Sequence, residues 1–421
     1  PSATAGLRPA VQGLLDYPWD CLEQRLSKAA ARAFRLNQGG RLGFMPHPAD
    51  GQAVEAALRQ VADFQTSSGG LAFWPGMKQA DLFLTAYALL AARQMQPKGP
   101  GLAPDIRKQA IGFLKDKLSS GKPPRKADLP QRLAEALALA ALAGEKEKGC
   151  LPLLQAALTR LDGLTPFGLA CLLDAARSLG QKQAVEELIK RLNNLAQISA
   201  GQLHFTAVNP GGLKAVMGST LRGNAAALWA LSKAQPDYPR LADLAAWVSL
   251  SLGRDSSLST QEAVFGLWGL GAYTESAGSG PVEMQVDLPG RKPFKHGFSG
   301  PDKPPVLLRV VRNLLSQGEK EQVRISATGA GQPFWSVRLS YAPGQPPAEP
   351  VNAGISIARL LRPLDGPAGQ PPAVGQELES VLTITVTQTR HHVLVVDPFP
   401  AGIEPQGAAQ GKPQGARAGG P

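Results

Sequence analysis

Apolar side chains recur with the period of an α-helix along most of the chain before residue 280. They stand at positions i, i+3 and i+4 in segments of about a dozen residues, and Gly, Pro or Asn lies between one segment and the next. No strand-like alternation interrupts the series, so the pattern predicts one helix after another. The predicted helices cover residues 54–66, 81–95, 105–118, 130–143, 151–162, 166–179, 181–197, 222–234, 239–252 and 260–274.

The helical series contains a repeat. GGLAFWP followed by DLFLTAYALLAARQ (69–94) is echoed by GQLHFTAV and RGNAAALWALSKAQ (201–235), and by SSLSTQEAVFGLWGLGAY (256–273). Such repeats favour helical hairpins that stack on their neighbours, in an open solenoid or a closed α/α toroid. We expect the aromatic residues of the series to pack between the helices. These residues are Phe73, Trp74, Tyr87, Trp229, Trp247 and Trp268.

After residue 278 the pattern changes to short alternating runs between Pro and Gly turns. Their β-branched residues and their period of two predict an all-β region. The predicted strands cover residues 306–315, 321–329, 335–343, 354–364, 379–388 and 391–399. From Gln406 onward no apolar residue larger than alanine occurs, so we expect this tail to be disordered.

The net charge of +11 does not indicate a nucleic-acid or membrane-surface partner. Both kinds of binding need basic residues that cluster in a run or on one face. The nearest candidate, Lys122 to Lys126, contains two prolines and fits a solvated loop. The sequence also shows no apolar stretch of membrane-spanning length and no signal peptide at Pro1.

The cysteines do not form a disulfide or zinc pattern. Cys21, Cys150 and Cys171 are too few and too unevenly spaced for a disulfide framework. No CxxC pair and no zinc-like Cys/His spacing occurs, so we expect neither a metal nor another cofactor. We expect Cys150 and Cys171 to be buried helix thiols, which leaves Cys21 to be explained.

The sharpest local feature is the segment YPWDCLEQRLSK, residues 17–28. Cys21 and Gln24 are three residues apart at the start of a helical pattern, so they lie on one side of a single turn. At that spacing the thiol sulfur can reach the side-chain carbonyl carbon. Attack by the thiolate with loss of ammonia would leave an internal thioester, an acylating group that survives only while it is shielded from water.

A C-x-x-Q pair alone also fits a buried cysteine beside a solvated glutamine, but the surrounding motifs resemble a known family. YPWDCLEQ resembles the thioester motif of the alpha-2-macroglobulin and complement family, which reads YP, an aromatic residue, a variable residue and then C-x-E-Q. Four further segments are similar to parts of the bacterial alpha-2-macroglobulins. They are GGLAFWP with LTAYAL (69–90), STQEAVFGLWGLGAY (259–273), AGISIARLLRPLDG (353–366) and HHVLVVDPFPAGIEP (391–405).

This resemblance implies a broad-spectrum inhibitor of endopeptidases rather than an enzyme. In the bacterial members a protease cleaves a bait segment, the molecule collapses around the protease, and the thioester acylates one of its lysines. By resemblance, Cys21 supplies the sulfur, Gln24 supplies the acyl group, and Glu23 is the acidic residue between them. The resemblance also implies a periplasmic, cell-surface or secreted location.

The resemblance further implies a multidomain organisation. Residues 1–277 would be an all-α thioester domain, an α/α toroid of helical hairpins. Residues 278–347 would be a partial CUB-like β region, 348–405 a partial C-terminal macroglobulin-like β domain, and 406–421 the disordered tail. The bait region and the earlier macroglobulin domains of the parent protein would be partners of this chain, so we expect the chain alone not to trap a protease.

Two departures from the family pattern concern the thioester. Asp20 stands where many members have glycine, which tolerates a positive φ more easily. No histidine occurs between His47 and His204, so direct attack by amines is the expected route rather than histidine-directed transfer to hydroxyls. We expect His204 to be structural. His391 and His392 fit paired surface residues better than metal ligands.

Two enzymatic alternatives remain open at this point. A terpene cyclase or prenyltransferase on the same toroid scaffold would need an aspartate-rich or zinc motif, and no DxDD or DDxxD occurs. A hydrolase with Cys21 as nucleophile would need a histidine base, for which His47 or His204 is available. A structural module without a thioester is the remaining possibility.

Overall fold

A computed structural model describes the chain in two units, residues 1–337 and 338–421. The described residues are 7–42, 45–95, 101–120, 129–199, 202–206, 216–254, 258–276, 280–288, 291–299, 306–309, 322–330, 333, 335, 337, 355–365, 372–386, 395–399 and 401–404.

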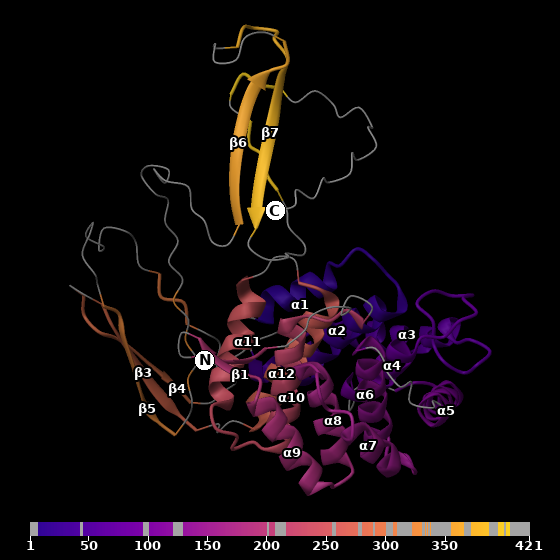
Figure 1. The fold of residues 1–421 in the computed structure, drawn as a ribbon. Helices are drawn as coiled ribbons and strands as arrows, with labels where there is room; N and C mark the ends of the chain where they lie inside the picture. The colour runs from indigo at the N-terminus through magenta and orange to yellow at the C-terminus, as the bar shows by residue number, and fades with distance from the viewer. Residues whose placement is uncertain are drawn as a thin grey trace. The chain divides into compact units, whose positions relative to one another are not determined.

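The first unit is mainly helical in its described part, with 12 α-helices before residue 277 (Figure 1). A short 3-10 helix, η2 (Val61–Phe64), follows the third of them. The α-helices are α1 (Leu7–Leu15), α2 (Leu22–Leu42), α3 (Asp50–Gln60), α4 (Leu82–Met95), α5 (Pro104–Ser120), α6 (Leu129–Gly144), α7 (Cys150–Leu158), α8 (Pro166–Ser178), α9 (Lys182–Asn193), α10 (Thr220–Ala234), α11 (Leu241–Arg254) and α12 (Thr260–Ser276).

The even-numbered helices form a closed ring. Each contacts the next, from α2 through α4, α6, α8 and α10 to α12, and α12 contacts α2 again. The odd-numbered helices lie outside this ring, and each contacts at least one inner helix. Of the two arrangements that the repeat allowed, the contacts therefore correspond to the closed one.

The sequence explains which helices are inside. The inner helices α4, α6, α8, α10 and α12 consist largely of Ala, Leu and aromatic residues and are buried along most of their length. The outer helix α9 instead buries only Leu188 and Leu192, as expected for a helix with one apolar stripe. Small residues let the inner helices approach closely, since a Cβ added at Gly269 of α12 would lie 2.5 Å from the Ala225 oxygen of α10.

The ten predicted helices of this unit are present, with shifts at their ends. The expectation that no strand interrupts them was wrong. β1 (Ala196–Ser199) and β2 (Gln202–Phe205) form an antiparallel hairpin, in which Ala196 pairs with Phe205. The Asn224 side chain of α10 accepts a hydrogen bond from Phe205 N–H at 2.7 Å and donates one to its carbonyl at 2.9 Å. This tertiary contact fixes an extended conformation that the local pattern does not reveal.

The aromatic residues of the repeat mostly pack between helices. Tyr87, Trp229 and Trp268 are buried, whereas Phe73 and Trp247 are half-buried. The expectation was wrong for Trp74, which is 52% exposed. Trp74 precedes Pro75 in the loop before α4, so it is not on a helix face that could turn it inward.

A three-stranded sheet follows the helices in the first unit (Figure 1). It has the order β4-β3-β5 and is antiparallel, with β3 (Val282–Asp287), β4 (Phe294–Phe298) and β5 (Arg324–Gly329). The strand predicted at 321–329 is confirmed, and β3 and β4 were not predicted. Residues 306–309 have no regular secondary structure, so the prediction of a strand there was wrong; 310–321 lie outside the described residues.

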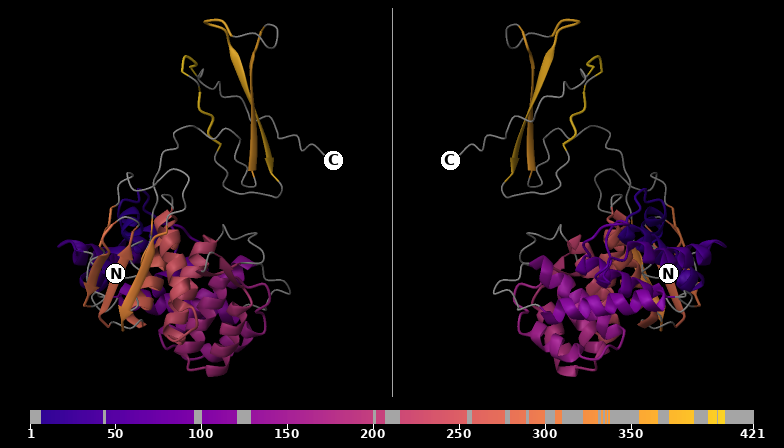
Figure 2. Two further views of the ribbon diagram at one scale, coloured as in Figure 1. Left: turned by 90° about the vertical axis from the view of Figure 1, so that its left-hand side faces the viewer. Right: turned by 90° about the vertical axis from the view of Figure 1, so that its right-hand side faces the viewer.

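The second unit contains one described hairpin (Figure 2). β6 (Ile355–Pro363) pairs antiparallel with β7 (Leu378–Val386), as predicted for 354–364 and 379–388. Residues 395–399 have no regular secondary structure, against the prediction of a strand. His391, His392 and the tail 406–421 lie outside the described residues. The predicted domain boundaries at 277, 347 and 405 stay predictions.

Within the described residues, no helix has both the length and the apolar character needed to cross a membrane.

Candidate functional site

Cys21 and Gln24 meet at the start of α2. Cys21 immediately precedes the first helical residue, Leu22, and Gln24 is the third helical residue. The Gln24 side chain turns back, and its Oε1 accepts a hydrogen bond from the Cys21 backbone N–H at 2.9 Å. This is the return contact of a helix capping box, in which the third residue satisfies an N–H that the helix leaves unpaired. The structure thus brings together the two residues that the motif singles out.

The turn before Cys21 accommodates Asp20 without strain. The non-glycine residues with positive φ in the described part are Lys146, Met217 and Arg240, and Asp20 is not among them. Its carboxylate instead forms an ion pair with Arg25 at 2.8 Å and a longer one with Lys28 at 3.4 Å. The absence of a glycine at this position therefore does not disturb the start of α2.

The Cys21 side chain is buried, with 8% of its surface exposed. Burial raises the pKa of its thiol above the ordinary value, and the negative charges of Glu23 and Asp20 act in the same direction. Hydrogen bonds from backbone N–H groups, the largest from Gln24, oppose this rise. The thiol is thus predominantly protonated at neutral pH, and its thiolate is a minor form.

Glu23 lies between the pair and is almost fully buried, at 1% exposure. Its Oε1 accepts hydrogen bonds from the Ser27 hydroxyl at 2.8 Å and from the Gln261 amide at 2.6 Å. The Thr260 hydroxyl lies 2.9 and 2.8 Å from its two oxygens. Because Thr260 and Gln261 open α12, this carboxylate joins the first and last helices of the ring.

The network continues from Ser27 to the Tyr87 hydroxyl of α4, at 2.7 Å. Tyr87 is fully buried, and burial together with the nearby Glu23 charge raises its pKa well above the ordinary value. Sequence reasoning missed Ser27, Tyr87, Thr260 and Gln261 as partners of Glu23. The available signal was the polar pair Thr260-Gln261 at the head of an otherwise apolar helix.

A buried cation faces the same end of the ring. Arg222, near the start of α10, is 1% exposed, donates a hydrogen bond to the Val216 carbonyl and stacks over Phe167 at 3.8 Å from the ring centre. Burial lowers its pKa to about 10, and the charges of Glu262 and Glu23 oppose that effect. Glu23 and Arg222 therefore place opposite charges in the apolar interior where several inner helices begin.

The other predicted residues lie elsewhere. His47 lies between α2 and α3, where its backbone N–H donates to the Asp50 carboxylate at 2.8 Å and its Nδ1 accepts a hydrogen bond from Ala49 N–H at 3.2 Å. His204 stacks on Trp247, with ring centres 5.3 Å apart. Cys150 and Cys171 are buried free thiols in α7 and α8, as predicted. Among the described residues, no group of three His, Cys, Asp or Glu could hold a metal.

Exposed aromatic side chains flank the buried Cys21. Trp19, two residues before it, is 66% exposed. The backbone N–H of Leu22 donates to the Phe73 carbonyl at 3.1 Å, which fixes the loop containing Trp74 beside the start of α2. Trp74 itself is 52% exposed. Exposed aromatic side chains thus lie on both sides of the N-terminus of α2.

Comparison with known proteins gives one family match and one curated relative. Residues 354–418 match the profile described as "Bacterial Alpha-2-macroglobulin MG10 domain", which extends past the predicted domain end at 405. The alpha-2-macroglobulin homolog of Nostoc sp. is 26% identical over 372 residues, which are 84% of this chain and 19% of that protein. The chain thus spans about a fifth of the length of this curated relative.

Solved structures of bacterial alpha-2-macroglobulins share the fold. The Escherichia coli protein from domain MG7 to the C-terminus is 20% identical, with a TM-score of 0.54 over 86% of this chain and 55% of that one. The Salmonella protein reacted with methylamine is 21% identical, with a TM-score of 0.56 over 90% and 24%. The trypsin-activated Escherichia coli protein is 19% identical, with a TM-score of 0.51 over 88% and 24%. The resemblance that the motifs indicate is confirmed.

Proposed function

The chain is similar to the C-terminal region of the bacterial alpha-2-macroglobulins, and on this premise we propose that Cys21 and Gln24 form an internal thioester in a protease-trapping inhibitor. The observation that carries the proposal is the hydrogen bond from Cys21 N–H to Gln24 Oε1 at 2.9 Å. It holds the Gln24 carbonyl over the cysteine at the N-terminus of a helix.

The local geometry favours attack on the Gln24 carbonyl. The Cys21 thiolate adds to the side-chain carbonyl carbon, and negative charge develops on Oε1. The backbone N–H of Cys21 and the positive end of the α2 dipole stabilise that oxyanion. The intermediate collapses with cleavage of the C–N bond, a proton passes to the leaving nitrogen, and ammonia departs. The product is a thioester between residues 21 and 24.

Transfer from the thioester requires an amine. A lysine amine of a protease, or methylamine, adds to the thioester carbonyl; the C–S bond breaks, and the Cys21 thiol is released while an amide forms on residue 24. The burial of Cys21 supports a bond that is protected from hydrolysis until the surroundings of α2 change. The solved relatives support this chemistry by analogy, since one was reacted with methylamine and another was activated by trypsin.

The proposal also includes the identities of the domains, the partners of the chain and the location of the parent protein. The closed ring of helices is proposed to be the α/α toroid thioester domain, the β4-β3-β5 sheet part of a CUB-like region, and the β6–β7 hairpin part of a macroglobulin domain. Target proteases and the remaining macroglobulin and bait domains are the proposed partners. We place the parent protein in the periplasm, at the cell surface or in the secreted fraction, and assign it as an inhibitor rather than an enzyme.

Mass spectrometry of the freshly purified chain tests the thioester. The expected result is a mass lower by one ammonia than the sequence requires, and methylamine treatment should add methylamine at residue 24 and expose one new thiol. Cys21→Ser removes the sulfur, and Gln24→Glu keeps an oxygen that can accept the Cys21 N–H bond while offering no amide to displace. Both variants should show the full sequence mass and take up no methylamine.

The competing interpretation is that Gln24 only caps α2. In that case the native chain has its full sequence mass and a free Cys21 thiol, and methylamine is not incorporated. This result would refute the thioester while leaving the fold unaffected.

A further inference from the structure

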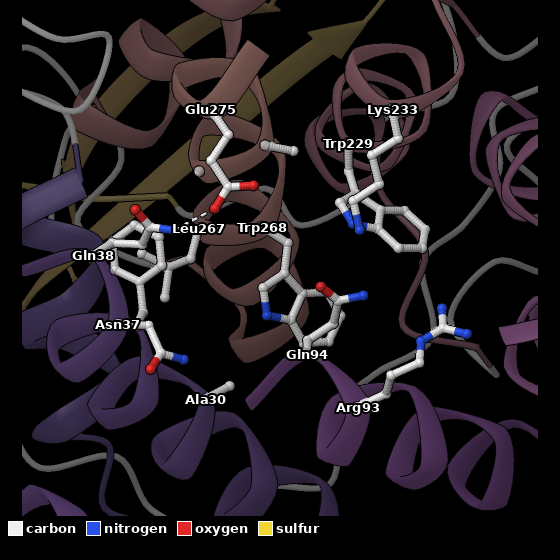
Figure 3. A pocket seen from close by; sticks show the side chains of 13 residues that line it. Ala30, Asn37, Gln38, Arg93, Gln94, Trp229, Lys233, Leu267, Trp268 and Glu275 are labelled. Atoms are coloured by element: carbon white, nitrogen blue, oxygen red, sulfur yellow. Dashed lines mark hydrogen bonds between the residues drawn. The ribbon is translucent and has the colours of Figure 1, made fainter. Parts of the chain in front are cut away.

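A cavity of ≈ 320 Å³ opens at the end of the helix ring opposite Cys21 (Figure 3). Residues near the C-terminal ends of three inner helices, α4, α10 and α12, line it together with α2, whereas Cys21 lies where α2 begins. Its volume is at the low end of the range for small-molecule sites. The thioester chemistry does not use this cavity.

The wall formed by α10 carries hydrogen-bond donors without acceptors. Trp229 is 1% exposed, and its indole Nε1 has no hydrogen-bond partner among the described residues. The Lys233 ammonium lies over the Trp229 ring, 4.7 Å from its centre, and no carboxylate of the described residues lies within ion-pair distance. Figure 3 shows both side chains at the cavity. The buried indole N–H lacks an acceptor and the half-buried ammonium has no carboxylate partner among the described residues, so a ligand that accepts hydrogen bonds from both would stabilise this wall.

The charged side chains around the cavity carry a net positive charge. Arg93 of α4 lines the cavity and binds the buried Asp174 at 3.2 Å, and Arg177 binds the same carboxylate at 2.8 Å. A side chain at Gly144 would overlap the Arg93 guanidinium, so this glycine permits its position. Arg93, Lys233 and Glu275 line the cavity, whereas Arg177 and Asp174 lie outside its lining, so cations exceed carboxylates by one in both counts.

Asn37, Gln38, Gln94 and Glu275 make much of the remaining lining polar, and one patch of it is apolar and aromatic. The buried Trp268 ring, Leu267 and Phe34 form this patch, and a Cβ at Gly271 would crowd Phe34 at 3.1 Å. Glu275 is occupied by the Gln38 amide. The cavity thus pairs two donors on α10 with an aromatic patch on the facing side, which suits a ligand that has one anionic end and an apolar body.

We propose that this cavity is a binding site for a small organic carboxylate with an apolar body, whose carboxylate accepts hydrogen bonds from Lys233 and from Trp229 Nε1. The apolar part lies against Trp268 and Phe34. The same chemistry exists in free aryl acids and in the carboxyl terminus of a peptide ending in an aromatic residue. The site does not depend on the thioester at the other end of the ring.

Nuclear magnetic resonance titration of the full chain tests the site with phenylacetate, phenylacetamide and acetyl-Gly-Gly-Phe as probes. The indole N–H signal of Trp229, identified by its loss in Trp229→Phe, should shift with phenylacetate and not with the amide. If only the acetylated tripeptide shifts it, the ligand is a peptide terminus; if phenylacetate suffices, a free acid is enough.

Lys233→Met keeps the apolar stem and removes the charge, and the loss of a half-buried cation that has no ion pair should leave the fold intact. We expect phenylacetate binding to weaken at least tenfold, as for a charged hydrogen bond. Lys190→Met, an exposed lysine on α9, is the matched control and should bind like the unaltered chain. Unweakened binding in Lys233→Met, equal binding of the amide, or no shift with any carboxylate would overturn the proposal.

The pH dependence of phenylacetate binding gives a further test of the contact with Lys233. Burial lowers the pKa of Lys233 to about 8, Arg177 and Arg93 act in the same direction, and Asp174 and Glu275 oppose it. The cationic form binds the carboxylate, so affinity should be constant below pH 8 and fall above it. A profile that stays flat up to pH 10 would contradict a contact between the carboxylate and Lys233.

Discussion

At the scale of single residues, the site depends on a carboxylate that has been taken out of water. Glu23 is held by the Ser27 and Thr260 hydroxyls and by the Gln261 amide, so each of its oxygens accepts at least one hydrogen bond. A buried carboxylate is tolerated only with such partners. Glu23, between Cys21 and Gln24, therefore fixes α2 to α12.

We expect Glu23→Gln to reduce the free energy of unfolding by about 1–3 kcal/mol, because it removes the charge that strengthens these hydrogen bonds and partly balances Arg222. Urea unfolding followed by circular dichroism measures the change. Glu55→Gln, whose glutamate is 46% exposed, should alter stability by less than about 0.5 kcal/mol. Equal stabilities for the two variants would show that the buried network does not hold the ring.

The reactivity of Cys21 is also a property of its surroundings. Because its pKa is raised, the thiolate fraction at a given pH is lower than in the unfolded chain. In Gln24→Glu, which cannot form a thioester, alkylation of Cys21 should therefore rise with pH along a curve displaced to higher pH than that of the unfolded chain. Peptide-resolved mass spectrometry after iodoacetamide pulses measures both curves. A native curve at lower pH would mean that the dipole of α2 outweighs burial.

At the scale of elements, close packing of small residues determines how the ring closes. Gly269 of α12 faces the Ala225 carbonyl of α10, and a Cβ would lie 2.5 Å from that oxygen. Backbone at such a contact cannot rotate away as a side chain can. The two helices must separate to admit any larger residue.

Gly269→Ala should destabilise the chain by about 1–3 kcal/mol through this overpacking. Gly112→Ala on α5 is the opposite case, since nothing lies within 4 Å of the added Cβ. There we expect a gain of about 0.5–1 kcal/mol from the higher helix propensity of alanine. Thermal unfolding of the two variants provides the comparison. A similar change in stability in both would show that the close approach of Gly269 to the Ala225 carbonyl does not limit the residue at this position.

The sequence predicts these elements unevenly, for physical reasons. Helices such as residues 82–95 are specified by their own apolar period and are confirmed. The β1–β2 hairpin depends on Asn224, which lies 19 residues from Phe205, and no local pattern encodes that pairing. The Cys21–Gln24 contact follows from spacing within one turn, whereas the Glu23 contacts with Thr260 and Gln261 join residues more than 200 positions apart in the sequence, where the first and last helices of the ring meet.

At the scale of the whole molecule, the helical ring and the β elements differ in how much apolar surface they bury. The ring has a continuous core, whereas the β4-β3-β5 sheet has a small cluster of Val282, Met284 and Phe298. In the β6–β7 hairpin, Ile357 is 50% exposed and Leu360 is 56% exposed. A hairpin of this kind is marginal by itself in water.

Hydrogen exchange followed by mass spectrometry should therefore show slow amide exchange in the helical ring and fast amide exchange in the β6–β7 hairpin. Amides of α4 and α6 should exchange slowest, because they open only with the whole ring, and amides of β6 and β7 should exchange much faster. Gln24→Glu, which cannot form a thioester, serves as a control that should not change this order of exchange rates. Protection of the hairpin equal to that of α4 would mean that the β region has the stability of the core.

A last prediction concerns what this chain does by itself if the proposed function is correct. The proposed trapping needs a segment that proteases cleave and a shell that closes around them, whereas the thioester proposed for Cys21 and Gln24 would contribute the acylating group. We therefore expect the isolated chain to incorporate methylamine and yet to leave the activity of trypsin on a protein substrate unchanged at molar excess. Residual cleavage of casein by trypsin, measured with the native chain and with Cys21→Ser, is the direct test. Inhibition by the native chain alone would mean that acylation suffices to block a protease, and inhibition by both would point to a surface that acts independently of the thioester.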